Sequence, residues 1–303
     1  MTCKCCKPSQ SSFSSLASSM PSTSILKDAD RNEQTATNQQ RTMTMLILLM
    51  MPKVLTALSS QTREAAQRIA QGMSPIPPDY RTRWVEQLYE AQKEEALKAL
   101  SAGWVIAATR VPNPTRDLSI EDIRIPVTGT GDEFSQNDNF APALLARLFA
   151  FLLMAAKLSA ETHAKRIEKE YAKWVGDVAL DNTARAAKVF GKITDLDKNH
   201  TEVIATSSTV WASNEGAARR YEAEGVTLVR WWTQEDERVC VFCNDLHGTI
   251  ISIDDYFVRP GQVLEVTVDG VVSSLKAPPW GMAHPPAHNR CRCTILPVIA
   301  SVR

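Results

Sequence analysis

Two groups of cysteine and histidine residues frame the last third of the chain and constrain its fold more than any other feature. The first group contains Cys240 and Cys243, and the second contains His288, Cys291 and Cys293. The other three cysteines of the 303-residue chain lie within its first six positions. The segment between the two groups combines short strand patterns with proline-rich loops, so it buries little apolar area by itself. A metal ion or a crosslink that joins its ends would compensate for this small core.

The spacing within each group favours metal binding. Two thiolates in a Cys240-x-x-Cys243 motif can converge on one ion. Residues two positions apart in an extended segment point to the same face, so Cys291 and Cys293 can also converge. A closed structural zinc site takes four nitrogen or sulfur ligands. The sequence therefore predicts a Zn²⁺ site formed by Cys240, Cys243 and two of the three residues His288, Cys291 and Cys293.

Other interpretations of these residues stay open. The thiols could form disulfides or remain free. A catalytic metal is the weakest alternative, because the chain shows neither an HExxH motif nor a two-histidine-one-carboxylate pattern. Asp236, His247, Asp254 and His288 are the acid/base candidates near the two groups, but no spacing assembles them into a known mechanism. His247 and His284 are interpreted as surface or turn histidines. No enzyme activity is expected.

The charge balance and the apolar segments restrict the partners. Lys+Arg and Asp+Glu both number 34, which argues against a polybasic surface for nucleic acid. The clustered cysteines favour a reducing compartment over a secreted disulfide framework. The apolar segment 148–156 is bracketed by Arg147 and Lys157 and is much shorter than the ~20 residues that span a bilayer. No membrane association is therefore expected.

The pattern along the chain predicts an α+β fold, with a mainly helical N-terminal and central region followed by a small β-rich, cysteine-stapled C-terminal subdomain. Residues 1–42 are rich in Ser, Thr, Gln and Asn, which predicts a disordered low-complexity tail. Residues 43–139 are expected to form a helical region with a long loop. Residues 140–225 form the helical part of the main domain, and residues 226–303 form the β-rich cysteine/histidine subdomain.

Hydrophobic periodicity and turn residues predict the individual elements. Helices are expected over 54–71, 79–102, 141–174, 177–190 and 201–224. Gly103, Gly191 and Gly225 are expected to end three of them. Strands are expected over 105–111, 120–127, 226–233, 262–268, 271–275 and 294–300. The dipeptide Asp269-Gly270 predicts a two-residue hairpin turn.

The C-terminal motifs resemble a known family. The series Trp232-Thr233, Asp236, Arg238-Val239-Cys240, Cys243, Leu246 and Gly248, followed by Pro285-Pro286-Ala287-His288-x-x-Cys291-Arg292-Cys293, is similar to the phage Mu F-like family of head morphogenesis proteins. Asn214 and Gly225-Val226 match an upstream helix of that family, and the resemblance covers about residues 140–300. The chain departs from the family at Thr206-Ser207-Ser208, where the family has Arg-Thr-Glu, and at Asn289, where it has Pro.

The resemblance implies a structural role without catalysis. A member of this family is expected to be a minor capsid protein of a tailed phage or prophage. It would be present in few copies in the virion head and in the host cytoplasm during assembly. It would associate with the portal protein and other head components, with self-association and DNA contact during packaging or delivery as further expectations. The alternative, which rests on the cysteines alone, is a zinc-ribbon-like nucleic-acid-binding protein.

Overall fold

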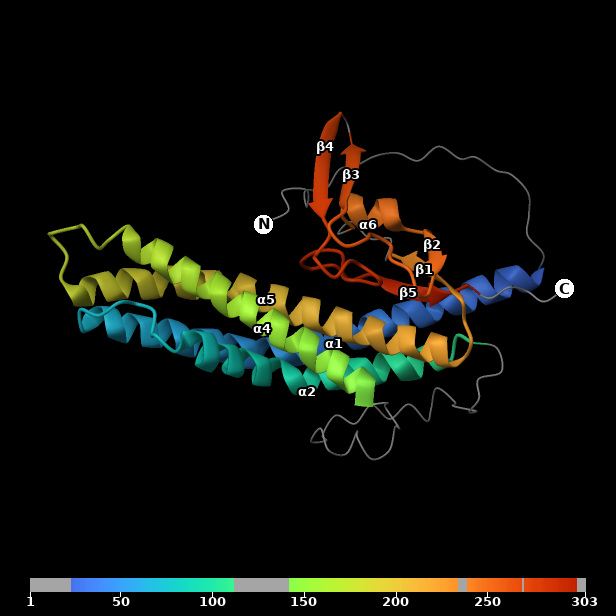
Figure 1. Cartoon of the computed structure of the whole chain (residues 1–303), viewed down its shortest axis with the longest axis horizontal. Helices are drawn as coiled ribbons and strands as arrows, with labels where there is room; N and C mark the ends of the chain where they lie inside the picture. The colour runs from blue at the N-terminus through green and yellow to red at the C-terminus, as the bar shows by residue number, and fades with distance from the viewer. Residues whose placement is uncertain (1–22, 112–141, 234–238, 269, 299–303) are drawn as a thin grey trace. The chain divides into compact units, whose positions relative to one another are not determined.

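In the computed structural model, residues 23–111, 142–233, 239–268 and 270–298 are described, with side chains from residue 34 onward. The long helices are α1 (Thr23–Ala70), α2 (Tyr80–Ala108), α4 (Pro142–Ala172) and α5 (Asn182–Ala223). The C-terminal region adds the short helix α6 (Val241–Leu246) and the strands β1 (Leu228–Trp232), β2 (Ile250–Ser252), β3 (Val263–Val268), β4 (Val271–Lys276) and β5 (Thr294–Pro297) (Figure 1). The predicted α+β fold class is confirmed, because long helices precede a group of small antiparallel strands.

The chain divides into two compact units. Unit 1 contains residues 1–43, 100–125 and 213–303, and unit 2 contains residues 44–99 and 126–212. Helices α1, α2 and α5 therefore each supply residues to both units. The units thus interleave along the sequence.

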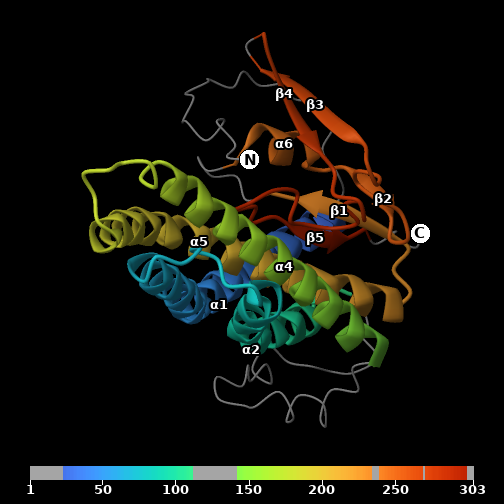
Figure 2. The same cartoon turned by 60° about the vertical axis from the view of Figure 1, so that its left-hand side comes forward.

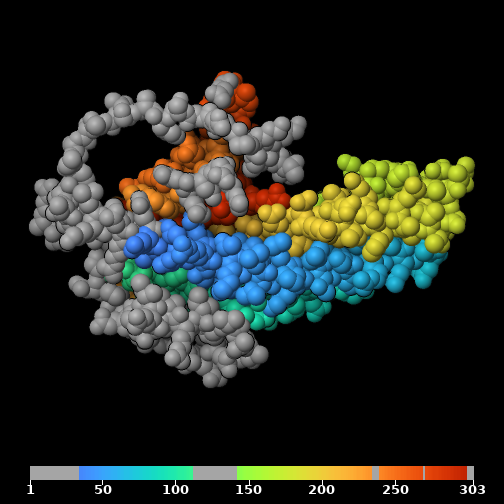
Figure 3. All heavy atoms as spheres, turned by 180° about the vertical axis from the view of Figure 1, so that it is seen from behind, coloured from blue at the N-terminus to red at the C-terminus, as the bar shows by residue number. Residues whose placement is uncertain are grey.

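The described part of unit 2 consists of helices with apolar stripes turned inward. In α4 every fourth residue is apolar and buried, from Leu144 through Leu148, Leu152 and Ala156 to Ala160. This repeat places the buried side chains on one face of the helix. Within unit 2, Figure 3 shows α1 (blue to cyan) and α5 (yellow) side by side.

Two helices also meet the length and composition expected of a membrane span, namely Gln34–Ala70 and Pro142–Ala172. Core helices of soluble proteins meet the same criterion, and both helices carry buried apolar stripes. The absence of membrane association therefore stays a prediction.

Unit 1 contains the sheet structure. Strand β1 lies between β2 and β5 and pairs antiparallel with both, and the buried Trp231 lies on it. Strands β3 and β4 form a separate hairpin that extends away from this sheet (Figure 2). Val268 pairs with Val271, and Gly270 has φ +76°, so the predicted two-residue turn is confirmed by the register.

The predicted end of α2 at Gly103 is wrong, because the helix continues to Ala108. A Cβ atom on Gly103 would lie 1.9 Å from the Ser213 carbonyl oxygen, and one on Gly216 would lie 2.1 Å from the Leu100 carbonyl oxygen. These glycines therefore allow α2 and α5 to approach closely within unit 1. The strand expected over 105–111 is also wrong, because α2 continues through Ala108 and a turn follows it.

The remaining predictions concern the N-terminal tail, the two helices before residue 225 and the strand over 120–127. The disordered tail over 1–42 is wrong from Thr23 onward, where α1 begins, and residues 1–22 lie outside the described residues. The helices expected over 177–190 and 201–224 are one helix, α5, in which Gly191 is an exposed interior residue. One interior glycine costs a helix only about 1 kcal/mol, so the helix continues through it. Gly225 does end α5, with φ +76°. The strand expected over 120–127 lies outside the described residues.

Candidate metal centre

Helix α6 positions the first pair of ligand candidates. Cys240 has an extended backbone conformation and is the N-cap residue of α6, where its Sγ accepts a hydrogen bond of 3.4 Å from the Cys243 backbone N–H. Cys243 lies in the first turn of the same helix. The Cys-x-x-Cys spacing therefore brings both sulfurs to the start of one helix, where backbone N–H groups favour a thiolate.

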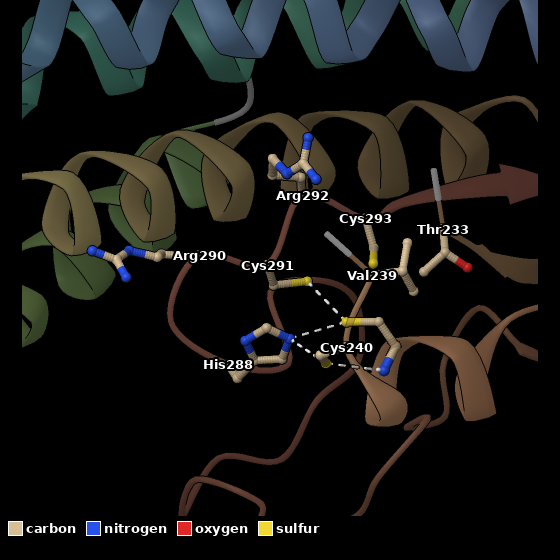
Figure 4. Close-up of a pocket in the computed structure, with 9 residues that line it drawn as sticks. Thr233, Val239, Cys240, His288, Arg290, Cys291, Arg292 and Cys293 are labelled. Atoms are coloured by element: carbon tan, nitrogen blue, oxygen red, sulfur yellow. Dashed lines mark hydrogen bonds between the residues drawn. The ribbon is translucent and has the colours of Figure 1, made fainter. Parts of the chain in front are cut away.

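The loop before β5 positions the second group. The Cys291 backbone N–H donates to the His288 carbonyl oxygen over 3.1 Å, and Arg290 has φ +65°, so the chain turns tightly between them. Figure 4 shows the side chains of Arg290 and Arg292 directed away from the cluster, while Cys291 and Cys293 are directed towards it. The alternation expected of Cys291 and Cys293 is therefore observed.

All five predicted ligand candidates are brought together at one small pocket. The His288 Nε2 atom lies 2.9 Å from the Cys240 sulfur and 3.1 Å from the Cys243 sulfur. The Cys243 sulfur lies 3.7 Å from the Cys291 sulfur. The ligand atoms of Cys243, Cys291 and Cys293 all lie within 4.8 Å of one another. This cluster could hold a metal ion.

The sulfurs are enclosed by the apolar core of unit 1. The same core cluster contains Trp231, Phe242, Leu246, Val258 and Met282 beside the four cysteines. Each of these four cysteines is a free thiol and at most 4% exposed. Among the described residues no disulfide joins the two cysteine groups, so without a metal these four cysteines are free thiols. Cys3, Cys5 and Cys6 lie outside the described residues.

The protons of the cluster are shared unevenly among its members. A hydrogen bond with Cys243, aided by His288, lowers the pKa of Cys240 to about 5, whereas the surrounding sulfurs raise the pKa of Cys243 far above its usual value. Burial acts to raise the pKa of Cys291, but hydrogen bonds with Cys243 and Cys293 hold it well below its usual value. Burial raises the pKa of Cys293. Buried thiols that compete for protons in this way favour a cation, which would stabilise them all as thiolates.

His288 has the orientation of a metal ligand. Its Nδ1 atom lies 2.6 Å from the Asn289 carbonyl oxygen, so Nδ1–H donates to that oxygen and Nε2 faces the sulfurs. Burial alone would lower the pKa of His288, but the Cys240 and Cys291 sulfurs raise it to about 9. A metal ion at Nε2 would replace the proton that these sulfurs attract.

Asn214 on helix α5 forms hydrogen bonds with the backbone of the segment that contains Cys293 and the start of β5. The Asn214 side chain donates from Nδ2 to the Cys293 carbonyl oxygen over 3.1 Å and accepts from the Ile295 backbone N–H over 3.0 Å. The Thr294 hydroxyl donates to Asn214 Oδ1 or to Gln39 Oε1, at 3.1 and 2.8 Å. Asn214 thus reproduces for β5 the pairing that a neighbouring strand would supply. Sequence spacing alone gave no signal for this role.

His284 was expected to be a surface or turn histidine; it lies in a bend of the chain, but it is buried against α5 and does not lie at the surface. Its Nε2 atom lies 2.9 Å from Glu215 Oε2, and its Nδ1 atom lies 2.7 Å from the Pro285 carbonyl oxygen. Both ring nitrogens lie within hydrogen-bonding distance of acceptor oxygens. These contacts tie the loop that carries His288 to α5.

The remaining acid/base candidates do not join the cluster. His247 Nδ1 contacts the hydroxyl and, at 3.2 Å, the backbone N–H of Thr233, and Asp254 is exposed to solvent. Asp236 lies outside the described residues. Of the acid/base candidates that the structure describes, His288 alone therefore lies in the cluster.

No protein-family model matches the chain, and neither a curated protein nor a solved structure matches it significantly.

Proposed function

We propose that the five-residue cluster binds one structural Zn²⁺ ion and that the chain is a non-enzymatic minor head protein of a tailed phage or prophage. In this proposal the ion closes the C-terminal subdomain, and the protein acts in head morphogenesis beside the portal protein.

The donor set and its spacing support zinc. Thiolate sulfur and imidazole nitrogen are the ligands of structural zinc sites, and two sulfurs on a tetrahedral Zn²⁺ lie about 3.8 Å apart. The Cys243 and Cys291 sulfurs are already 3.7 Å apart. His288 Nε2 is nearer to the Cys240 and Cys243 sulfurs than ligands of one ion would be, so a bound ion would separate these atoms slightly.

The observation that carries the structural assignment is the enclosure of the donors. Four of the five donors are cysteines buried in an apolar core, and five donors exceed the four that a closed site needs. A catalytic zinc site keeps a position open for water or substrate. A closed, buried site instead contributes folding free energy to a segment with a small core.

The zinc content of the purified protein tests this assignment. Protein purified under reducing conditions is expected to contain one zinc per chain by elemental mass spectrometry. Cys243→Ser should weaken zinc binding and unfold at lower temperature although four donors remain, because Cys243 belongs to both ligand groups, Cys240–Cys243–His288 and Cys243–Cys291–Cys293, and its removal separates them. Asn244→Ser is the matched control, since Asn244 is the exposed neighbour on α6. Metal-free wild-type protein that is as stable as the zinc-loaded protein would contradict the proposal.

The head role rests on the resemblance to the phage Mu F-like family, and the motif that carries it coincides with the cluster. The motif residues His288, Cys291 and Cys293 are ligand candidates, and the matched Asn214 holds the Cys293 carbonyl. These four motif residues therefore lie in one packed unit, which supports a structural role for the motif.

Composition of assembled particles tests the head role. The protein is expected in purified phage heads at a few copies per particle, and a tagged chain should capture the portal protein. Its absence from heads that contain portal protein would contradict the proposal. Salt-sensitive binding to DNA by a protein absent from heads would instead support the nucleic-acid-binding alternative.

A further inference from the structure

We propose that the outward face of α4 is a docking surface for a second copy of this chain, which pairs antiparallel with it about Met154. Helix α4 lies wholly in unit 2, whereas the cysteine cluster lies in unit 1. The proposal is therefore independent of the metal centre.

The exposed side of α4 is apolar over several turns. Between Pro142 and Leu158 the charged residues are Arg147 and Lys157, and every other residue is apolar. Only 28% of the 18-residue apolar stretch that qualifies α4 as a possible membrane span is buried. Leu153 and Leu158 are 42% and 53% exposed. Single apolar side chains are normal on a protein surface, but a continuous exposed apolar face marks an interaction site.

The opposite side of α4 is already occupied by its own unit. The buried stripe from Leu144 to Ala160 packs inward. Beside this stripe, Phe149 contacts Tyr89 of α2 with ring centroids 6.5 Å apart, and Phe151 stacks on Trp211 of α5 with ring centroids 4.1 Å apart. Within unit 2, Figure 1 shows α4 on the side nearest the viewer. The inward side of α4 is therefore satisfied, and a further partner can reach only its outward side.

The residue spacing defines the outward face. Arg147, Ala150, Met154, Leu158 and Glu161 follow one another at intervals of three or four positions, so they share one side of the helix. Arg147, Ala150 and Leu158 are exposed, and Met154 and Glu161 are partly exposed. This face thus has an apolar centre with a cation before it and an anion after it.

The order of these residues selects an antiparallel second copy. A two-fold axis at Met154 brings residues that lie equally far before and after it face to face in the two copies. Ala150 then faces Leu158 of the second copy, so a small side chain meets a large one. Arg147 faces Glu161 of the second copy, and the symmetry repeats this ion pair. A parallel arrangement would instead place like charges together.

A second copy suits this face better than a lipid surface does. The acyl chains of a bilayer offer no counter-charge, and a charged side chain within them is costly. Arg147 and Glu161 both lie on the outward face. The antiparallel pair gives each of them an oppositely charged partner.

Sedimentation velocity of the purified full chain over a series of concentrations tests the proposal. A reversible equilibrium between monomer and dimer is expected. Glu161→Arg should weaken the dimer by at least about tenfold, because both ion pairs become like-charged contacts. Arg147→Glu should weaken it in the same way. The double variant with both substitutions exchanges the two charges and should restore the dimer.

Arg63→Glu is the matched control, because Arg63 is an exposed arginine on α1. It makes the same change of charge and should leave the equilibrium unchanged.

Three results would overturn the proposal. A chain that is monomeric at every concentration has no such interface, and a monomer that floats with phosphatidylcholine vesicles would assign the face to lipid. A dimer that forms equally well in Glu161→Arg would place the interface elsewhere. A double variant that is folded by circular dichroism but does not regain the dimer would refute the antiparallel register.

Discussion

Replacement of Gly103 by alanine should destabilise the protein, although alanine is the better helix former. The added Cβ would lie 1.9 Å from the Ser213 carbonyl oxygen and 2.7 Å from the Ser213 carbonyl carbon. An ordinary contact needs about 1.5 Å more, and backbone atoms cannot rotate away as a side chain can. Helices α2 and α5 would have to separate where Leu100 and Gly216 also touch.

The size of the effect follows from two opposing terms. Overpacking of a close contact costs up to about 3 kcal/mol. The gain from replacing glycine in a helix is about 1 kcal/mol. Gly103→Ala should therefore lower the free energy of unfolding by about 2 kcal/mol. Since Ser213 precedes Asn214, the displaced helix should also loosen the support of Cys293 and weaken zinc binding.

Gly191→Ala is the matched control, because Gly191 lies in α5 with no atom within 4 Å of its added Cβ. This variant should gain about 0.5–1 kcal/mol from helix propensity alone. Urea denaturation followed by far-ultraviolet circular dichroism measures both variants. Equal or greater stability of Gly103→Ala relative to wild type would refute the close helix contact.

Three further outcomes are expected. Asn214→Ala removes the side-chain partner of the buried Cys293 carbonyl and Ile295 N–H and should cost about 2–4 kcal/mol in urea denaturation; a loss below about 0.5 kcal/mol would contradict its role. In chelated protein the unfolding free energy should fall as pH is lowered from 6.5 towards 4, because His163 and His200, with native pKa values of about 3, bind protons only when unfolded. The raised pKa of Asp197, about 6, offsets the contribution of one of the two histidines to this pH dependence. His200→Gln should reduce the slope of unfolding free energy against pH by about 1.4 kcal/mol per pH unit, and an unchanged slope would show that His200 is not buried in its neutral form. Zinc removal should speed amide hydrogen exchange within residues 284–293, which connect to the core through the cluster; unchanged exchange there would argue against a stabilising ion.

Local spacing was sufficient for the features that depend on neighbouring residues. The pair Cys240 and Cys243 converges because the two residues lie three positions apart at the start of α6. Cys291 and Cys293 converge because alternate residues of an extended segment share a face. The hairpin between β3 and β4 follows from one glycine that accepts positive φ. These predictions needed no knowledge of distant contacts.

Glycine and histidine were misinterpreted where the deciding contact is distant in the sequence. Gly103 was expected to end a helix, but it lies inside α2, where the missing side chain lets α5 pack closely. His284 resembles a loop histidine, but it is buried against Glu215. A single residue type fits several roles, and only the surface packed against it selects one.

The sequence by itself determined that this protein is α+β, with helices followed by a small subdomain whose ends carry five metal-ligand candidates. The reason is that helix and strand periods and short ligand spacings are local properties of the chain. Only the tertiary structure decided that His288 presents Nε2 to the sulfurs and that Asn214 bonds the backbone next to Cys293. It also decided that His163 meets Asp197 beside Thr62. These arrangements arise from packing between helices and strands far apart in the sequence, and no local pattern records which faces will meet.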